Sequence, residues 1–292
     1  MTEMGYGQAD WAGAGRRNAL SRLPASLAFG TIGILLLILL FLISPQFLPY
    51  APNDQNLAER LQSPGFAHWL GTDNYGRDLF SRILHAGRID FQIAIVAASF
   101  AFLIGTFLGA LAGFYEGVLD TLLMRALDVF VSFPDMVLTI AIVGLFGMEL
   151  PGLYIALGLV GWVPYARLVR AEVLTVKRLD YALAAKALGC GNSRLLWRHL
   201  LPHSISQAIV YAASSVTFNI LAITSLGYLG VGIRPPQAEW GAMIAEGRSF
   251  ILSSPGLVLF PGLMLTLTGV TFSALGDGLA EMLQPVRKTN YF

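Results

Sequence analysis

Charged residues are scarce in this chain of 292 residues. Only 13% are Asp, Glu, Lys or Arg, against ~25% in ordinary soluble domains, whereas 55% are hydrophobic. A soluble chain of this composition would need one very large core with almost no polar shell, which surface-to-volume scaling excludes. The net charge of +1 also argues against nucleic-acid binding, which needs a clustered basic surface.

Motifs for disulfides, metals and nucleotides are lacking as well. The single cysteine, Cys190, excludes an internal disulfide framework. A P-loop needs Gly-Lys-Ser/Thr, but the three lysines follow valine, alanine and arginine. His199 and His203 are four residues apart, as zinc ligands on a helix can be, but Pro202 separates them and no third ligand is near. We therefore expect no catalytic residue, metal or cofactor on this chain.

Long stretches without charge predict an all-α membrane protein. Four of them can supply the ~20 apolar residues that cross ~30 Å of hydrocarbon: Leu23–Asn53, Phe91–Tyr115, Ser204–Ile233 and Ser249–Gly276. Leu150–Ala166 is shorter but sufficient, and Met136–Met148 crosses only if Val129–Phe133 extends it across Pro134. The apolar part of the first stretch, Ala25–Ile43, is longer than a signal-peptide h-region, so we expect it to stay as an anchor.

The distribution of basic residues sets the predicted orientation. The loop Arg167–His203 holds seven Lys and Arg residues, which the positive-inside rule places in the cytoplasm. This placement requires the weak third span to cross, giving six spans with both termini cytoplasmic. Residues 1–90 then form the cytoplasmic N-terminus, first span and periplasmic segment. Residues 91–292 form a membrane core whose cytoplasmic loop is 167–203.

The predicted outer segment, Ser44–Asp90, divides in two. Its first half is rich in proline and favours an extended chain. Beyond Gly76, Leu79, Phe80, Ile83 and Leu84 recur at helical spacing opposite polar residues. We expect a short helix there, lying along the outer surface, and both lipid contact and packing on neighbouring spans stay open for its apolar face.

Small and polar residues within the spans indicate how they pack. Gly105, Gly109 and Gly113 recur every four residues and predict the close approach of another helix. Thr217, Asn219 and Thr224 lie in the fifth span, where they could line a translocation path. The alternative for these three residues, hydrogen bonding between helices or to their own backbone, stays open.

The cytoplasmic loop carries a pattern that suits a partner contact. Asp180 is expected to cap a short helix on which Tyr181, Ala184, Ala185 and Leu188 share a face. Gly189 and Gly191 permit left-handed turns that would end it, and a second amphipathic piece, Ser193–Leu201, is expected to stop at Pro202. A short exposed helix held between two spans can fill a groove on another protein, although a purely structural loop remains open.

Several of these residues resemble a known family. Ala184, Ala185, Gly189 and Leu201-Pro202 resemble the "EAA…G…LP" loop of binding-protein-dependent ABC importer permeases. Other signatures resemble its dipeptide/oligopeptide/nickel branch and its "C"-type subunit: Leu70–Asp73, Gly76–Asp78, Ser81-Arg82, Leu229–Gly232, Pro235-Pro236 and Trp240–Met243. This chain departs from the family pattern at Leu183, His203 and Ile223, where Glu, Asn and Glu are usual.

The resemblance implies a type I permease core formed by the last five spans, working within an assembly. The implied partners are a homologous second permease, two cytoplasmic ATPases that carry ATP and Mg, a periplasmic or lipid-anchored solute-binding protein, and membrane lipid. Residues assigned to ATPase coupling are Asp180, Tyr181, Ala184, Ala185, Leu188, Gly189, His199 and Pro202. Pro235, Pro236, Trp240 and Gly241 are assigned to the binding protein.

The cargo and a rival class stay open from the sequence. Di- and oligopeptides lead by resemblance, beside nickel chelates, glutathione and oligosaccharides. A proton-coupled secondary transporter would show inverted repeats and charges near mid-membrane, and neither occurs. Asp128 and Asp135 flank the inner end of the third span, where an ordinary ion pair or helix-end charge is the better interpretation.

Overall fold

The computed structural model describes residues 24–43 and 46–283. Most of these residues are helical, and none of them lies in a β-strand. The longer helices are α1 (Ala25–Ile38), α2 (Leu79–Tyr115), α3 (Gly117–Val131), α4 (Asp135–Phe146), α5 (Leu150–Val176), α9 (Ser206–Tyr228) and α11 (Gly256–Leu283). The shorter ones are α6 (Asp180–Ala187), α7 (Asn192–Arg194), α8 (Leu201–Ser204) and α10 (Trp240–Gly247). The expectation of an all-α membrane fold is confirmed.

Four helices, α2, α5, α9 and α11, are each long and apolar enough to span a membrane. The pair α3 and α4 passes the same test together but bends by 91° at its break, and α1 is a shorter apolar helix. Pro134 at the break is the residue at which an extension was predicted, and it supplies the N-cap of α4. The count of six spans therefore remains a prediction.

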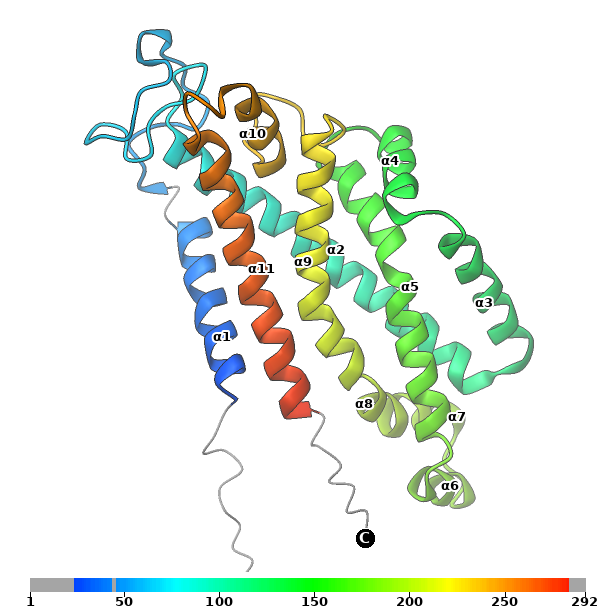
Figure 1. The fold of residues 1–292 in the computed structure, drawn as a ribbon. Coiled ribbons are helices and arrows are strands. Elements are labelled where there is room, and N and C mark those ends of the chain that lie inside the picture. Colours follow the sequence, from blue (N-terminus) through cyan, green and yellow to red (C-terminus); the bar gives the residue numbers. More distant parts are fainter. Residues whose placement is uncertain (1–23, 44–45, 284–292) are drawn as a thin grey trace, which may run out of the picture.

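The helices run between two ends of the bundle (Figure 1). One end, which we call the α6 end, holds α6 together with the start of α1 and the end of α11. The opposite end, called the α10 end, holds α10 and the segment between α1 and α2. Both ends of the described chain therefore lie on the side that carries α6.

Helix α2 differs from its prediction. The expected surface helix beyond Gly76 is the first part of α2, which continues for 37 residues. Leu79, Ile83 and Leu84 are buried, and so is Arg82 on the face predicted to be polar. The polar face is buried because its charges are paired, which sequence periodicity alone cannot show. At 1.5 Å per residue α2 is ~55 Å long, so it exceeds the ~30 Å of hydrocarbon that a span must cross.

Glycines let α2 and α5 pack backbone against backbone. A Cβ added to Gly105 would meet the carbonyl of Trp162, and one added to Gly109 would meet the carbonyl of Ala166. At Gly113 it would lie 2.8 Å from the carbonyl oxygen of Arg170. The prediction of close helix packing at these three glycines is confirmed.

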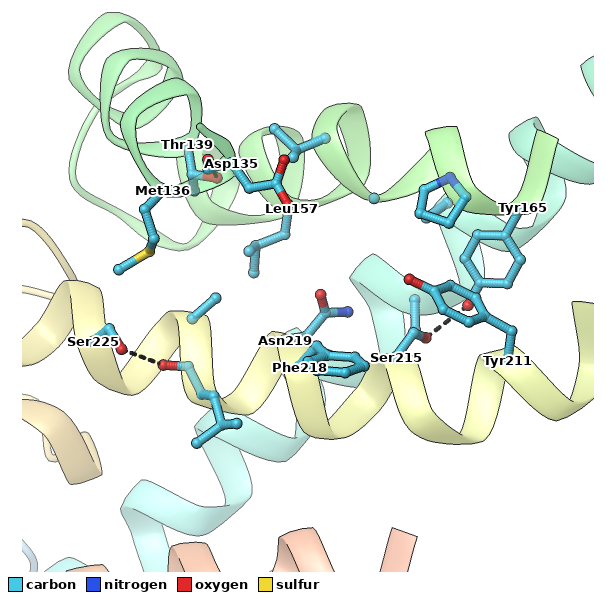
Figure 2. Close-up of a pocket in the computed structure, with 17 residues that line it drawn as sticks. Asp135, Met136, Thr139, Leu157, Tyr165, Tyr211, Ser215, Phe218, Asn219 and Ser225 are labelled. Atoms are coloured by element: carbon cyan, nitrogen blue, oxygen red, sulfur yellow. Dashed lines mark hydrogen bonds between the residues drawn. The ribbon is translucent and has the colours of Figure 1, made fainter. Parts of the chain in front are cut away.

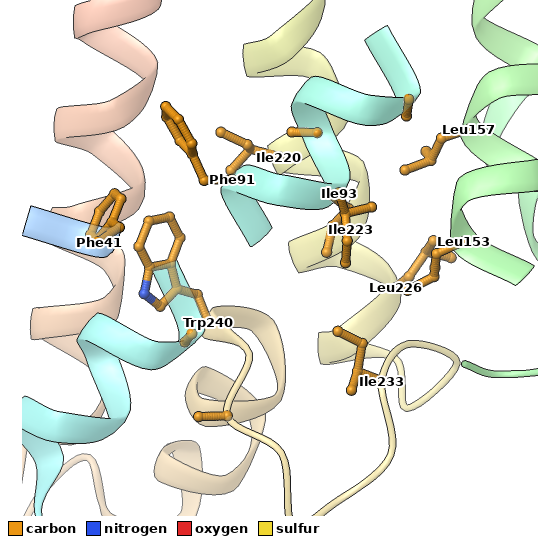
Figure 3. Packing of buried hydrophobic residues seen from close by; sticks show 14 of the residues in the cluster. Phe41, Phe91, Ile93, Leu153, Leu157, Ile220, Ile223, Leu226, Ile233 and Trp240 are labelled. Carbon is orange, nitrogen blue, oxygen red and sulfur yellow. The ribbon is translucent and has the colours of Figure 1, made fainter. Parts of the chain in front are cut away.

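Two apolar clusters fill the bundle. The larger lies toward the α10 end and joins α2, α5 and α9 to Trp240 at the start of α10 (Figure 3). Trp240 packs edge-on to Phe41, with ring centroids 5.5 Å apart, and its indole N–H donates to the carbonyl of Ile83 at 3.1 Å. The second cluster joins α2, α5 and the α6–α9 region, including Ala182 of α6. The apolar cluster at the α10 end and the one at the α6 end therefore both contain residues of α2 and α5.

The α2–α5 contact predicts that a methyl group added at one glycine of α2 lowers the stability of the protein. Gly109→Ala should lower the free energy of unfolding by about 1–3 kcal/mol, because the new methyl overpacks a backbone contact. Gly262→Ala on α11 is the control, since a Cβ there meets nothing within 4 Å and alanine favours the helix by ~1 kcal/mol. Thermal unfolding of the purified protein in detergent measures both. Equal melting shifts in the two variants would contradict the contact.

Candidate functional site

The predicted contact helix exists as α6, with a different N-terminus. Its N-cap is Leu179, which makes no side-chain capping hydrogen bond, and Asp180 is the first helical residue. The expectation that Asp180 caps the helix is therefore wrong. As an acid in the first turn, Asp180 still interacts favourably with the positive end of the helix dipole.

The C-terminus of α6 is a Schellman motif. Gly189 has φ +82°, its N–H donates to Lys186 at 3.0 Å, and the N–H of Cys190 donates to Ala185 at 3.1 Å. The prediction that Gly189 ends the helix in a left-handed turn is confirmed. Gly191, with φ −65°, is not left-handed and instead precedes the next helical turn.

The residues predicted to share a face of α6 divide into two groups. Tyr181 and Ala184 are exposed, and the Leu188 side chain is 89% exposed at the tip. Ala185 is half-buried and packs with buried Ala182 against the rest of the chain. The outward face is therefore narrower than predicted, and Ala185 belongs to the seat of α6 and not to its exposed face.

The chain after α6 stays helical through Pro202, so the predicted stop there is wrong. A π-helical turn, Leu195–Leu200, precedes the proline, and Pro202 lies in the first turn of α8. The wider turn accommodates a residue that lacks an N–H. His199 is half-buried on this turn, and exposed His203 packs against the Tyr181 ring at 5.4 Å. This ring contact joins α6 to α8.

Three ion pairs join α3 and the end of α2 to α5 near the α6 end. Arg170 on α5 donates to both carboxylate oxygens of Asp120 on α3, each at 2.5 Å. Lys177 donates to Glu116 at 2.9 Å and holds the pKa of that exposed carboxyl below its usual range. Asp128 pairs with Arg167 at 3.5 Å, so the expected ion pair at this acid is confirmed. These contacts tie α3 and the end of α2 to α5.

A cavity of about 490 Å³ opens between α2, α4, α5 and α9 (Figure 2). Asn219 lines it, and its amide donates to the carbonyl of Ala94 at 3.1 Å. Tyr165 and Ser215 share a 2.6 Å hydrogen bond at the wall, and Tyr211 packs edge-on to Tyr165 at 4.9 Å. Asp135 adds a carboxylate at the start of α4. The lining thus combines an apolar surface with a few hydroxyl, amide and acidic groups.

The other polar residues of the fifth span lie elsewhere. Thr217 borders a separate cavity of about 170 Å³ between α9 and α11. Thr224 is buried where Gly241 of α10 approaches its carbonyl. Ile223 is fully buried in the apolar cluster, so this departure from the family pattern does not alter the cavity lining. Of the three predicted path residues, only Asn219 faces the main cavity.

Sequence reasoning missed most of the cavity lining, although α9 carried a signal for it. Five of the seven lining residues of α9 recur at intervals of three and four: Tyr211, Ser215, Phe218, Ala222 and Ser225. Such spacing marks one face of a helix. Tyr165 and Asp135 come from other helices, and only tertiary structure brings them to this face.

At the α10 end, the four residues assigned to a binding protein differ in exposure. Pro235 and Pro236 are exposed. Trp240 is fully buried, and Gly241 is buried against the backbone of Thr224. The assignment of Trp240 and Gly241 to a surface contact is therefore corrected, because both are structural residues that fix α10 on the bundle.

The charged signature around Gly76 forms a buried network that reaches α10. Arg77 binds Asp73 at 2.6 Å and Glu246 of α10 at 2.7 Å, and Arg82 approaches Asp73 at 3.4 Å. Asp78 caps α2 by accepting from the N–H of Ser81 at 2.7 Å. Sequence reasoning gave these residues no role, and the structure shows that they join the segment before α2 to α10.

The structure is that of a helical membrane protein, with a cavity inside the bundle and a short exposed helix, α6, at one end. Residues 105–288 match the family of binding-protein-dependent transport system inner membrane components. The chain belongs to this family, as the resemblance predicted. Membership favours the permease of an ABC importer over a proton-coupled secondary transporter.

Relatives with several cargoes are similar over most of the chain. The dipeptide transport system permease protein of Alkalihalophilus pseudofirmus is 38% identical over 89% of this chain and 86% of its own. The glutathione transport system permease protein of Pectobacterium atrosepticum is 39% identical over 88% and 85%. The nickel transport system permease protein of Escherichia coli is 35% identical over 89% and 94%.

The Schellman turn generates a prediction for α6. Gly189→Val should cost at least about 1–2 kcal/mol locally, since a β-branched residue is strained at φ +82°. A Cβ at this position meets nothing within 4 Å, so backbone strain alone should cause the effect. We expect membrane insertion to survive while transport falls sharply. Gly191→Val, at ordinary φ, is the control, and equal transport by both variants would show that the turn does not position α6.

Proposed function

We propose that this chain imports di- or oligopeptides, or a related small solute, as one of two permease subunits of an ATP-driven importer. The observation that carries the coupling step is α6 itself. It presents an apolar tip, Leu188, and its Schellman turn and the seat at Ala182 and Ala185 fix its orientation. An exposed leucine held rigidly at the end of a bundle suits the groove of a partner protein.

Each assigned coupling residue has a distinct part in this proposal. Tyr181, Ala184 and Leu188 contact the partner ATPase, with Asp180 exposed beside them. Ala185 and Gly189 position that face from within α6. We call Tyr181, Ala184 and Leu188 the docking face. His199 and Pro202 lie on the segment that links α6 to α9, so they connect α6 to the membrane helices and do not touch the ATPase themselves. ATP and Mg belong to the two partner ATPases, which supply the energy for transport.

The second permease would complete the cavity. Phe218 and Leu221 of α9 line it and are 60% and 46% exposed, so the wall they form is open on this chain. A homologous permease packed there would bury these apolar side chains and enclose the cargo. The remaining apolar surface of the bundle faces membrane lipid.

The cargo proposal rests on the relatives and on the lining. Dipeptide, glutathione and nickel permeases are among the similar proteins, and two of these cargoes are peptides. Asp135 and Asn219 offer a carboxylate and an amide to the amino and amide groups of such a solute. Pro235 and Pro236, exposed at the α10 end, are the proposed contact for a solute-binding protein on the outer side.

The proposed topology has six spans with both termini cytoplasmic, and it predicts labelling from one side. In a Cys190→Ser background, cysteines at Gln55 and Gln237 should react with an impermeant thiol reagent applied to intact cells. A cysteine at Asn192 should react only after the membrane is opened. All three positions are exposed, so burial does not explain a difference. Labelling of Asn192 in intact cells would reverse the orientation.

The docking face predicts a separable loss of coupling. Leu188→Asp should abolish co-purification of the ATPases and substrate-stimulated ATP hydrolysis, because a charge replaces an apolar anchor at the contact. The side chain is 89% exposed, so the fold of this chain should be unaffected. Leu252→Asp is the matched control, since Leu252 is 98% exposed in the segment between α10 and α11. If Leu188→Asp retains both activities in reconstituted vesicles, α6 is not the ATPase contact.

A further inference from the structure

Two acidic side chains lie buried together where α10 meets α2 and α9, and the coupling proposal uses neither. Asp90 of α2 and Glu239, the residue before α10, are both 0% exposed. The backbone N–H of Trp240, the residue after Glu239, donates to Asp90 Oδ2 at 3.2 Å. This bond brings the two acids to the same end of α10.

The hydrogen bonds of the two carboxyl groups are unequal. Glu239 accepts from the N–H of Gly241 at 2.6 Å and of Ala242 at 2.8 Å, so both of its oxygens cap the start of α10. The Oδ1 atom of Asp90 is buried and has no hydrogen-bond donor. A buried carboxylate oxygen without a donor is costly, whereas the same oxygen in protonated form is itself a donor.

The surroundings supply no compensating cation. The electrostatic influences on Asp90 are its burial, the charge of Glu239 and the N–H of Trp240, and those on Glu239 are burial and its two capping N–H groups. On α9, the backbone of Gly227 lies directly against the Glu239 carboxylate and leaves no room for a Cβ. The two buried arginines at this end, Arg77 and Arg82, are paired with Asp73 and Glu246 instead.

We infer that Asp90 and Glu239 form a proton-binding site that holds one proton between them, and that this proton keeps the start of α10 docked on α2 and α9. Two adjacent buried carboxylates cannot both be ionised at low cost, so one of them carries a proton. The unequal hydrogen bonds assign it to Asp90, whose Oδ1–H can then donate, while ionised Glu239 caps the helix. The two groups titrate as a pair.

The pair also sets a direction for pH dependence. Burial raises the pKa of Glu239 from 4.5 to about 7, and because the two acids titrate together this rise belongs to the pair and not to Glu239 alone. A carboxyl group whose pKa is higher in the folded state than in the unfolded state stabilises the fold relatively at low pH. Its contribution therefore falls as pH rises from about 4.5 through about 7. Above that range the second negative charge should loosen α10 from α2.

Asp90→Asn tests the site because an amide reproduces the donor pattern of the protonated acid. Its oxygen can accept from Trp240 N–H and its NH₂ can donate in place of the proton. We expect the variant to fold, and its melting temperature to fall less between pH 5 and 8 than that of the wild-type assembly, because a second charge no longer forms beside Glu239. Asp54→Asn, an exposed acid-to-amide change outside the helices, should keep the wild-type slope. A slope unchanged in Asp90→Asn would overturn the inference.

Infrared spectroscopy gives a second measurement on the unmodified assembly. The carbonyl stretch of a protonated carboxyl group should be present at pH 6, vanish on alkaline titration, and differ in frequency in Asp90→Asn, where only Glu239 can carry the proton. If Asp90→Asn folds poorly, the wild-type titration alone still decides whether the pair holds a proton. No protonated carboxyl band at pH 6, or melting that follows the concentration of Na⁺ or K⁺ in place of pH, would show that the pair does not bind a proton.

Discussion

The backbone contact between α2 and α5 is the constraint on which the rest of the structure depends. Both apolar clusters and both candidate sites are built on this pair of helices. Glycines at three successive turns of α2 allow its axis to approach α5 until side chains no longer separate them. Without water, helices associate through such close packing and not through a hydrophobic driving force. The α2–α5 pair therefore acts as a frame on which α9 packs directly, while α10 and α11 pack on α9 and α1 packs on α11.

Ion pairs lie at both ends of this frame, and they differ in how strongly they hold the neighbouring segments together. At the α10 end, buried Arg77 and half-buried Glu246 form an ion pair that joins the segment before α2 to α10. At the α6 end, the pair of Lys177 and Glu116 is more exposed and contributes less, since solvent screens it. The charged network thus fixes the α10 end firmly, whereas the α6 end is held chiefly by packing around Ala182 and Leu196. The end that contacts the proposed ATPase is the one with fewer buried charges.

Sequence patterns predicted the features that depend on local chemistry. The left-handed turn at Gly189 and the α2–α5 glycine contact both follow from what a missing Cβ permits. The errors arose where tertiary contacts override local preference. Paired charges bury the start of α2, a π-helical turn carries the chain through Pro202, and packing removes Trp240 from the surface. The pairing of Asp90 with Glu239 joins residues 149 positions apart and has no sequence signal.

The connectivity suggests how a push on α6 would reach the cavity. Helix α5 ends at Val176 and α6 begins at Asp180, while the helical segment after α6 continues almost without interruption into α9. Both α5 and α9 line the cavity, through Tyr165 on one and Ser215 on the other, and these two residues share a hydrogen bond. Helix α6 follows α5 after three residues and packs on the π-helical turn Leu195–Leu200 that leads to α9, so a displacement of α6 would be passed to both helices. Movement of α6 would therefore change the separation of Tyr165 and Ser215, and with it the width of the cavity.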